Sequence, residues 1–335
     1  MKSKALVKVM SVSVLFSILV VFPILIVCAQ PAQAAEAFPS KSIQFFIGGT
    51  PGDAYDTNGR KFAPTLAKKL GVDVLPANLL GPMSVHFWDQ IYGAKPDGHT
   101  VGFIGAADRP YLMFMGDRLK YDVTEIPVVC AINTFPDLVW ASAKSKLNIR
   151  TAEQLLNYKG PIRVNLFSSI LVGVCSLAIV AQERNLDLRP VVYAGFSEGH
   201  VAMLRGDVDI GTTTASGTPL KFIQAGHYIP LFVWGAKRFE KLPDTPCSRE
   251  LKLNPDLEGT MQQRIFVTTP GTPPDRIAKL AEAVKATLTD PEIVEWGKTA
   301  NQPLFYMSTQ DYVENEGKVL ALYRKYMSAI KPFLK

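Results

Sequence analysis

Residues 195–199 read G-F-S-E-G, a G-x-S-x-G pattern that places Ser197 where a hydrolase carries its nucleophile. An apolar, extended run precedes the pattern and a helix-like stretch follows it. A serine nucleophile also needs a histidine to take its proton and an acid to orient that histidine, in the order serine, acid, histidine. Only His227 could follow an acid after Ser197, and the remaining C-terminal residues contain no histidine. The missing partners disfavour a serine hydrolase, which stays our third hypothesis.

Other catalytic and cofactor sites lack their motifs as well. The sequence has no H-E-x-x-H, no C-x-x-C and no pair of histidines four residues apart. The run G-G-T-P-G at 48–52 has neither the dinucleotide-binding nor the P-loop spacing. We therefore expect no catalytic residue, no metal and no cofactor.

The turn at 48–56 offers binding chemistry instead. A helix is expected to begin near Asp53 or Asp56, and the first turn of a helix has unpaired amide groups and a partial positive charge. Such amides can hold a small carboxylate without an arginine. An ordinary strand-to-helix connection explains the same residues equally well.

Alternating strand-like and helix-like segments must position these turns, and they predict an α/β architecture with a mostly parallel sheet. Strands are expected at 42–47, 100–104, 162–166, 190–194, 208–212 and 229–234. Helices are expected from about 53 to 70, from 274 to 288 and from Ser308 to Ile330. A capping box at 151–154 should open a short helix, and another helix should follow the strand at 162–166 and run to about 184. Ligands of open α/β sheets bind beyond the carboxyl ends of strands, so several turns could converge on one cleft.

The N-terminus predicts export. Lys2, Lys4 and Lys8 precede an apolar run, and Ala32-Gln33-Ala34 has the small residues of a cleavage site. We predict a signal peptide over 1–34 and a periplasmic mature protein, with an uncleaved membrane anchor as the alternative. Removing three lysines and no acid lowers the formal charge from +6 to +3, which does not indicate a nucleic-acid partner.

Three cysteines remain in the mature chain. Cys130, Cys175 and Cys247 are an odd, widely spaced set, which is neither a disulfide framework nor a zinc pattern. We expect buried thiols, and the alternative is one disulfide.

Five short stretches, in order along the mature chain, match the pattern of one known family. They read F-P-S-K-S-I at 38–43, P-G-D-A-Y-D at 51–56, K-P-D-G-H-T at 95–100, G-D-V-D-I at 206–210 and L-P-D-T-P at 242–246, the last followed by Glu250. The chain resembles the periplasmic substrate-binding proteins of tripartite tricarboxylate transporters.

The resemblance implies an α/β, two-lobed periplasmic-binding-protein fold of the type II or flytrap kind, with two crossover strands and a ligand cleft between the lobes. Lobe 1 would comprise 36–138 and 220–335, and lobe 2 would comprise 139–219, with approximate boundaries. It implies a monomeric, non-enzymatic receptor that captures a small carboxylate and delivers it to a large and a small integral membrane subunit. A ligand sensor for a membrane receptor, with the same fold, is the alternative.

The same resemblance implies substrate-binding residues on both lobes. They are Thr50, Gly52, Asp53, Ala54, Tyr55, Asp56, Ala106, Phe167, Ser168, Ser169, Gly195, Phe196 and Ser197. Asp53 replaces a glycine of the family pattern, and its charge would repel an anion unless it turns away or caps the helix. In place of a nucleophile, Ser197 would be a helix-capping or ligand-facing hydroxyl.

The loops at 78–83 and 166–173 are more apolar than the family pattern. We therefore expect a ligand less polar than citrate, such as an aliphatic or aromatic monocarboxylate. Tyr55, Phe167 and Phe196 are the candidate walls of its site. Packing of these apolar residues between the lobes is the alternative.

Overall fold

The computed structural model describes residues 37–79, 84–114, 119–133, 136–167, 172–193, 196–215, 217–260, 263–300, 302 and 304–334. The chain divides into two units, Met1–Ser40 and Lys41–Lys335, and all described helices and strands belong to the second. The predicted signal peptide at 1–34 lies outside the described residues.

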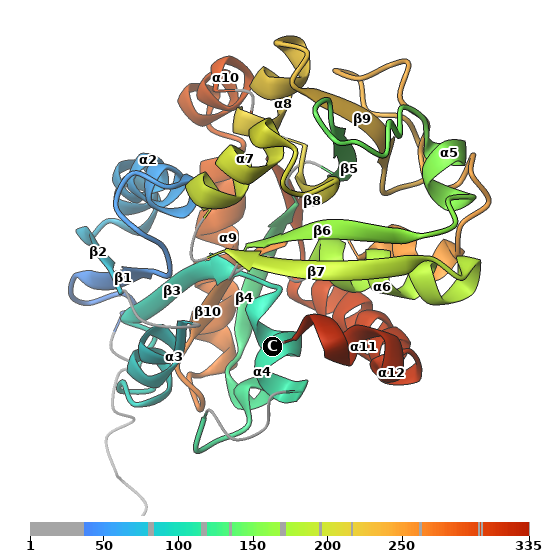
Figure 1. Cartoon of the computed structure of the whole chain (residues 1–335). Helices are drawn as coiled ribbons and strands as arrows, with labels where there is room; N and C mark the ends of the chain where they lie inside the picture. The colour runs from blue at the N-terminus through green and yellow to red at the C-terminus, as the bar shows by residue number, and fades with distance from the viewer. Residues whose placement is uncertain are drawn as a thin grey trace, which may run out of the picture. The chain divides into compact units, whose positions relative to one another are not determined.

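Six strands form the first sheet, in the order β11-β4-β10-β3-β1-β2 (Figure 1). They are β1 (Ile43–Ile47), β2 (Val74–Asn78), β3 (Thr100–Gly105), β4 (Val128–Asn133), β10 (Gln263–Thr268) and β11 (Phe305–Met307). β1 pairs in parallel with β2 and β3, whereas β10 runs antiparallel to β3 and β4, and β11 runs antiparallel to β4. The expected mostly parallel sheet is therefore wrong, because β10 returns from elsewhere in the chain and inserts between two strands of the opposite direction.

Five strands form the second sheet, in the order β7-β6-β8-β5-β9. They are β5 (Asp137–Ser142), β6 (Pro161–Phe167), β7 (Asp187–Tyr193), β8 (Ile210–Thr214) and β9 (Tyr228–Val233). β6 is parallel to β7 and β8, and β5 is antiparallel to β8 and β9. The chain thus changes sheet between β4 and β5 and returns between β9 and β10. The boundary that we placed at 219/220 does not mark this return, because β9 still pairs with β5; the division into lobes stays a prediction.

Helices lie on both faces of the two sheets (Figure 1). They are α2 (Ala54–Leu70), α3 (Val85–Tyr92), α4 (Asp108–Phe114), α5 (Ala152–Leu156), α6 (Val172–Arg184), α7 (Phe196–Arg205), α8 (Gly217–Gln224), α9 (Pro274–Leu288), α10 (Pro291–Thr299), α11 (Thr309–Lys325) and α12 (Met327–Ile330). The capping box of Thr151 and Gln154 is confirmed. The final helix does not continue to Ile330 as expected, because it ends at Lys325 and Tyr326 leaves the helical conformation. None of the helices within the described ranges is long and apolar enough to cross a membrane.

α11 contributes to two separate hydrophobic cores. Tyr312, in its first turn, is buried with residues of β3, β4 and β10. Leu322 and Tyr323, near its end, are buried with residues of β6, α6 and β9, and Ile330 of α12 joins them. The C-terminal part of the chain therefore packs on the second sheet as well as on the first.

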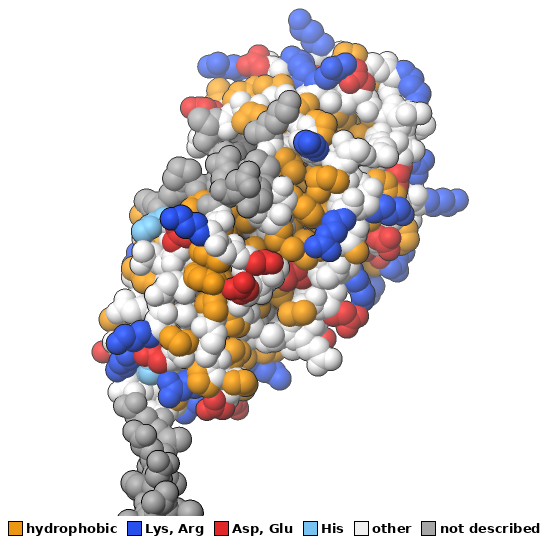
Figure 2. Space-filling model, turned by 90° about the horizontal axis from the view of Figure 1, so that it is seen from below, with side chains coloured by type: hydrophobic (Ala, Val, Ile, Leu, Met, Phe, Trp, Pro, Cys, Tyr) orange, Lys and Arg blue, Asp and Glu red, His pale blue; other side chains and the backbone are white. Residues whose placement is uncertain are grey.

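The expectation of buried thiols is confirmed. Cys130, Cys175 and Cys247 are buried free thiols, and burial raises the pKa of Cys175 to about 12. Lys and Arg side chains are interspersed with Asp and Glu on the face shown in Figure 2. That face shows no continuous basic surface of the kind that binds nucleic acid.

Candidate ligand-binding site

The carboxyl ends of three parallel strands meet at one edge of the first sheet. Ile47 at the end of β1 pairs with Asn78 at the end of β2 and with Phe103 of β3. β10 runs the opposite way, so its first residues lie at this edge, and Arg264 pairs with Gly105. The loop at 48–56, Ala106 and Arg264 therefore lie at this edge. Open α/β sheets bind their ligands beyond the carboxyl ends of their strands.

Local sequence signals shape the loop and start α2. Gly52 has φ 84°, a left-handed conformation that costs a residue with a side chain more than it costs glycine. Asp53 is extended, with φ −75° and ψ −179°, and it is the N-cap of α2. Gly71, with φ 74°, ends the helix. The predicted helix start near Asp53 and its end at Gly71 are confirmed.

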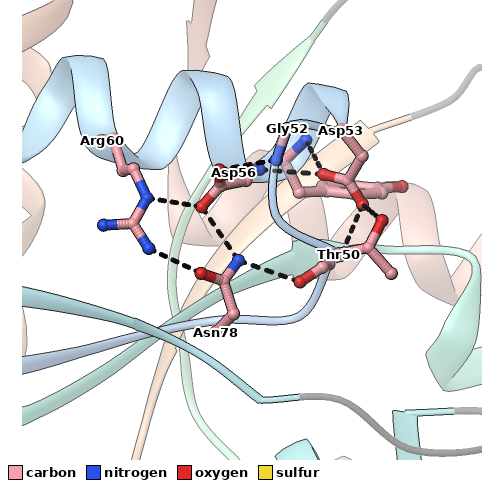
Figure 3. A network of polar contacts seen from close by, with 8 residues as sticks. Thr50, Gly52, Asp53, Asp56, Arg60 and Asn78 are labelled. Atoms are coloured by element: carbon pink, nitrogen blue, oxygen red, sulfur yellow. Dashed lines mark hydrogen bonds and ion pairs between the residues drawn. The ribbon is translucent and has the colours of Figure 1, made fainter.

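The carboxylate of Asp53 folds back onto its own loop (Figure 3). Its Oδ1 accepts hydrogen bonds from the amides of Tyr55 at 2.8 Å and Asp56 at 2.9 Å. Its Oδ2 accepts from the amide of Thr50 at 2.6 Å and from the Thr50 hydroxyl at 3.1 Å. Asp53 therefore caps the helix, which is one of the two arrangements that we expected to remove its repulsion of an anion.

Asp56 makes a second, buried network beside the first (Figure 3). Its Oδ2 accepts from the amide of Gly52 at 2.8 Å, and its Oδ1 accepts from Arg60 Nε at 2.7 Å and Asn78 Nδ2 at 2.9 Å. The hydrogen bond from Gly52 is the main reason that the pKa of Asp56 lies below its usual value. Asn78 also donates to the carbonyl of Gly49 at 3.0 Å, so it fastens the end of β2 to the loop.

These networks use the amides that we expected to be unpaired. The amides of Thr50, Gly52, Tyr55 and Asp56 all donate to Asp53 or Asp56. That expectation is wrong for these four groups, because two aspartates of the loop act as internal acceptors. Within the ranges that the structure describes, no acceptor is recorded for the amides of Gly49 and Ala54.

Sequence analysis missed Arg264, a buried cation at the same edge. The residue is 7% exposed, and its Nε has no hydrogen-bond partner among the described residues. Its Nη1 donates a long bond of 3.3 Å to Gln302, and its Cζ lies 5.3 Å from the centre of the Tyr55 ring. Burial lowers the pKa of Arg264, and Tyr55 and Asp53 oppose this effect. The signal was an arginine directly before the apolar stretch I-F-V of a strand.

Three of the predicted second-lobe residues, Phe167, Phe196 and Ser197, are among the described residues. Phe167 ends β6 and pairs with Tyr193, which ends β7, and Phe196 begins α7. Ser197 is exposed and is the second residue of α7, so it does not hold the capping position that we gave as one alternative. Ser168, Ser169 and Gly195 lie outside the described residues.

A buried carboxyl group that sequence analysis also missed begins β5. Asp137 is fully buried, and its Oδ1 accepts from the Thr214 hydroxyl at 3.2 Å. Its Oδ2 and the Thr212 hydroxyl have no partner within the described residues. A side chain at Gly173 would come within 2.5 Å of Thr212 Oγ1, so glycine lets the first turn of α6 approach. Burial raises the pKa of Asp137 to about 7.

The histidine nearest to Ser197 in the chain does not make a proton acceptor for it. His200 is buried, its Nδ1 contacts the hydroxyl of Tyr228, and burial lowers its pKa to about 4. The contact and the burial commit this side chain to the core beside β9.

Comparisons with known proteins find relatives over most of the chain. The family model described as "Tripartite tricarboxylate transporter family receptor" matches residues 59–319. The "UPF0065 protein in gbd 5'region" of Cupriavidus necator is 26% identical over 294 residues, which are 85% of this chain and 86% of that protein.

Solved structures show the same fold. A TctC solute binding protein from Polaromonas has a TM-score of 0.72 at 20% identity, over 87% of this chain and 99% of that one. The structure of R. palustris Rpa4515 with adipate has a TM-score of 0.67 at 20% identity, over 88% and 98%. The predicted two-lobed α/β fold and the predicted family resemblance are confirmed.

Proposed function

Because the chain belongs to the family of tripartite tricarboxylate transporter receptors, we propose that it captures a small organic acid outside the cytoplasm and delivers it to a transporter. The transporter would have one large and one small integral membrane subunit. The match over residues 59–319 carries this proposal. The protein acts as a monomeric receptor in the periplasm and catalyses no reaction.

The geometry of the first sheet supports a ligand at its carboxyl edge. The loop residues Thr50 to Asp56, Ala106 and Arg264 gather there from β1, β3 and β10. The positive end of the 17-residue helix α2 points toward the same edge and favours negative charge. On the second sheet, the ends of β6 and β7 and the start of α7 supply the remaining site residues, including Phe167, Phe196 and Ser197.

The ligand is less polar than citrate. The carboxylate of Asp53 already accepts from the first loop, and its negative charge repels a ligand with several carboxylates. Tyr55 presents an aromatic ring that packs edge-on against Phe103, with ring centres 6.4 Å apart. An aromatic ring beside a cation suits an acid with an apolar remainder.

A thermal-shift screen of organic acids tests the proposal. An acid at 100 times its Kd stabilises the native state by about 2.7 kcal/mol. We expect such a shift with at least one monocarboxylate, and uptake of that acid in membrane vesicles that contain the two transporter subunits only when the receptor is added. The absence of a shift with every acid would contradict acid capture, and binding without receptor-dependent uptake would favour a sensor.

A further inference from the structure

Two buried arginines of this protein have very different surroundings. Arg109 is held by Glu316, with Nε–Oε1 at 2.7 Å and Nη2–Oε2 at 3.3 Å, and its Nη1 donates to the carbonyls of Val123 and Ile126. Arg264 has no carboxylate within ion-pair distance among the described residues, and its Nε has no acceptor. Arg109 has the surroundings of a structural arginine, and Arg264 does not.

A buried charge without a partner is costly, so a protein keeps one where it serves a purpose. The long bond to Gln302 and the ring of Tyr55 satisfy only part of the Arg264 guanidinium. An acceptor could therefore bind Nε without breaking any bond recorded among the described residues.

The place of Arg264 fits an external acceptor. It lies on β10 opposite Gly105, at the edge where β1, β2 and β3 end. Four of the competing amide donors at this edge are already in use, because they donate to Asp53 or Asp56. The neutral amides of Gly49 and Ala54 are weaker donors to a carboxylate than a guanidinium. A carboxylate that arrives there meets Arg264 as the strongest donor with an unused N–H group.

We propose that Arg264 binds the carboxylate of the ligand at the first sheet, and that Asp53 limits the ligand to a single carboxylate at this edge. This inference rests on the proposed function and narrows its substrate class to monocarboxylic acids with an uncharged remainder. A guanidinium and a carboxylate make strong, charge-assisted hydrogen bonds. Asp53 already fills the position at the start of α2 that a second carboxylate would need.

Paired acids and two arginine variants test the inference. Calorimetry compares hexanoate with adipate, which have the same carbon chain, and benzoate with terephthalate, which have the same aromatic ring. The members of each pair differ by one carboxylate. We expect the wild type to bind the monoacid of a pair about 10-fold more tightly than the diacid, or better. Arg264→Met should weaken the binding of that monoacid about 30-fold or more, and Arg264→Lys should weaken it less.

Arg163→Met is the matched control. Arg163 pairs with buried Asp209 at 2.7 Å in the second sheet, so its loss should lower the stability and leave binding unchanged. Arg264→Met should show the reverse: stability in urea equal to or above the wild type, because an unpaired buried charge is removed, and weak binding. This reversal separates a ligand-binding role from a structural one.

The outcomes distinguish the two proposals. Wild-type affinity in Arg264→Met, or a wild-type preference for the diacids, would overturn the inference while acid capture stands. If neither these acids nor any acid of the thermal-shift screen binds, the proposed function is overturned together with the inference.

Discussion

Asp53 Oδ2 lies 2.6 Å from the amide nitrogen of Thr50, so the first loop closes on a carboxylate of its own. The other oxygen of Asp53 accepts from two amides at the start of α2. The positive end of this helix therefore holds an internal anion. In the proposed site, that single side chain would limit the negative charge that a ligand can bring to the loop.

Replacing Asp53 by glycine should open this position. We expect Asp53→Gly to lose less than about 1 kcal/mol of stability, because glycine is a tolerated N-cap. The amides of Thr50, Tyr55 and Asp56 become available, so the affinity for adipate should rise relative to hexanoate in calorimetric titrations. Asp122→Gly is the control, since Asp122 caps a short 3-10 helix in the same way. An unchanged ratio of the two affinities would contradict this prediction.

Gly52 and Gly71 offer a matched test of the first loop. Both have positive φ, at 84° and 74°, and a side chain at either position would meet nothing within 4 Å. Alanine at each should lower the free energy of unfolding by a similar amount, about 1 kcal/mol, through the left-handed backbone alone. Only Gly52→Ala should also weaken the binding of the acid found in the screen. Equal binding by the two variants would remove the loop from the site.

Asp56 should be needed for the stability of the loop. Asp56→Ala leaves the amide of Gly52 and Arg60 Nε without their acceptor and removes one of the two acceptors of Asn78 Nδ2. We expect a loss of about 2 kcal/mol in urea unfolding, and a smaller loss for Asp56→Asn, which keeps one acceptor oxygen. The pKa of Asp56 is lowered in the folded state, so its contribution is present above about pH 4 and is lost as the pH falls below that value. Identical acid unfolding of the wild type and Asp56→Asn would speak against this role.

Asp137 should make the free energy of unfolding fall as the pH rises from about 4 to about 7. Its pKa is raised to about 7 in the folded state by burial, against about 4 in an unfolded chain. The folded state binds the proton more tightly, so stability is full below about pH 4 and decreases as the pH rises through 7. Asp137→Asn should remove this decrease and be the more stable protein at pH 8. Urea unfolding of both proteins at pH 5 and pH 8 measures this difference, because all other titrating groups contribute equally to the two proteins. Parallel pH profiles of the free energy of unfolding would refute the prediction.

Local signals predicted the β1–loop–α2 unit well. The glycine at 52, the capping aspartate and the glycine at 71 each act within a few residues, and the structure follows them. The same signals could not tell which amides stay free. Asp53 and Asp56 compete with a ligand for those donors, and only their side-chain conformations decide the outcome.

The long-range arrangement was beyond sequence reasoning. β10 enters the first sheet antiparallel between β3 and β4, and this pairing brings Arg264 under the ring of Tyr55. Asp137 becomes buried because β5 lies between β8 and β9. Periodicity within a strand carries no information on such neighbours, so both charged residues went unnoticed.

The two cores that share α11 bear on how such a receptor can move. Tyr312 is fixed in the first core and Tyr323 in the second, on one continuous helix. The helix therefore connects the two cores, in addition to the two chain connections between the sheets. A rotation of one sheet against the other would therefore have to bend α11 or move Tyr312 or Tyr323 out of its core.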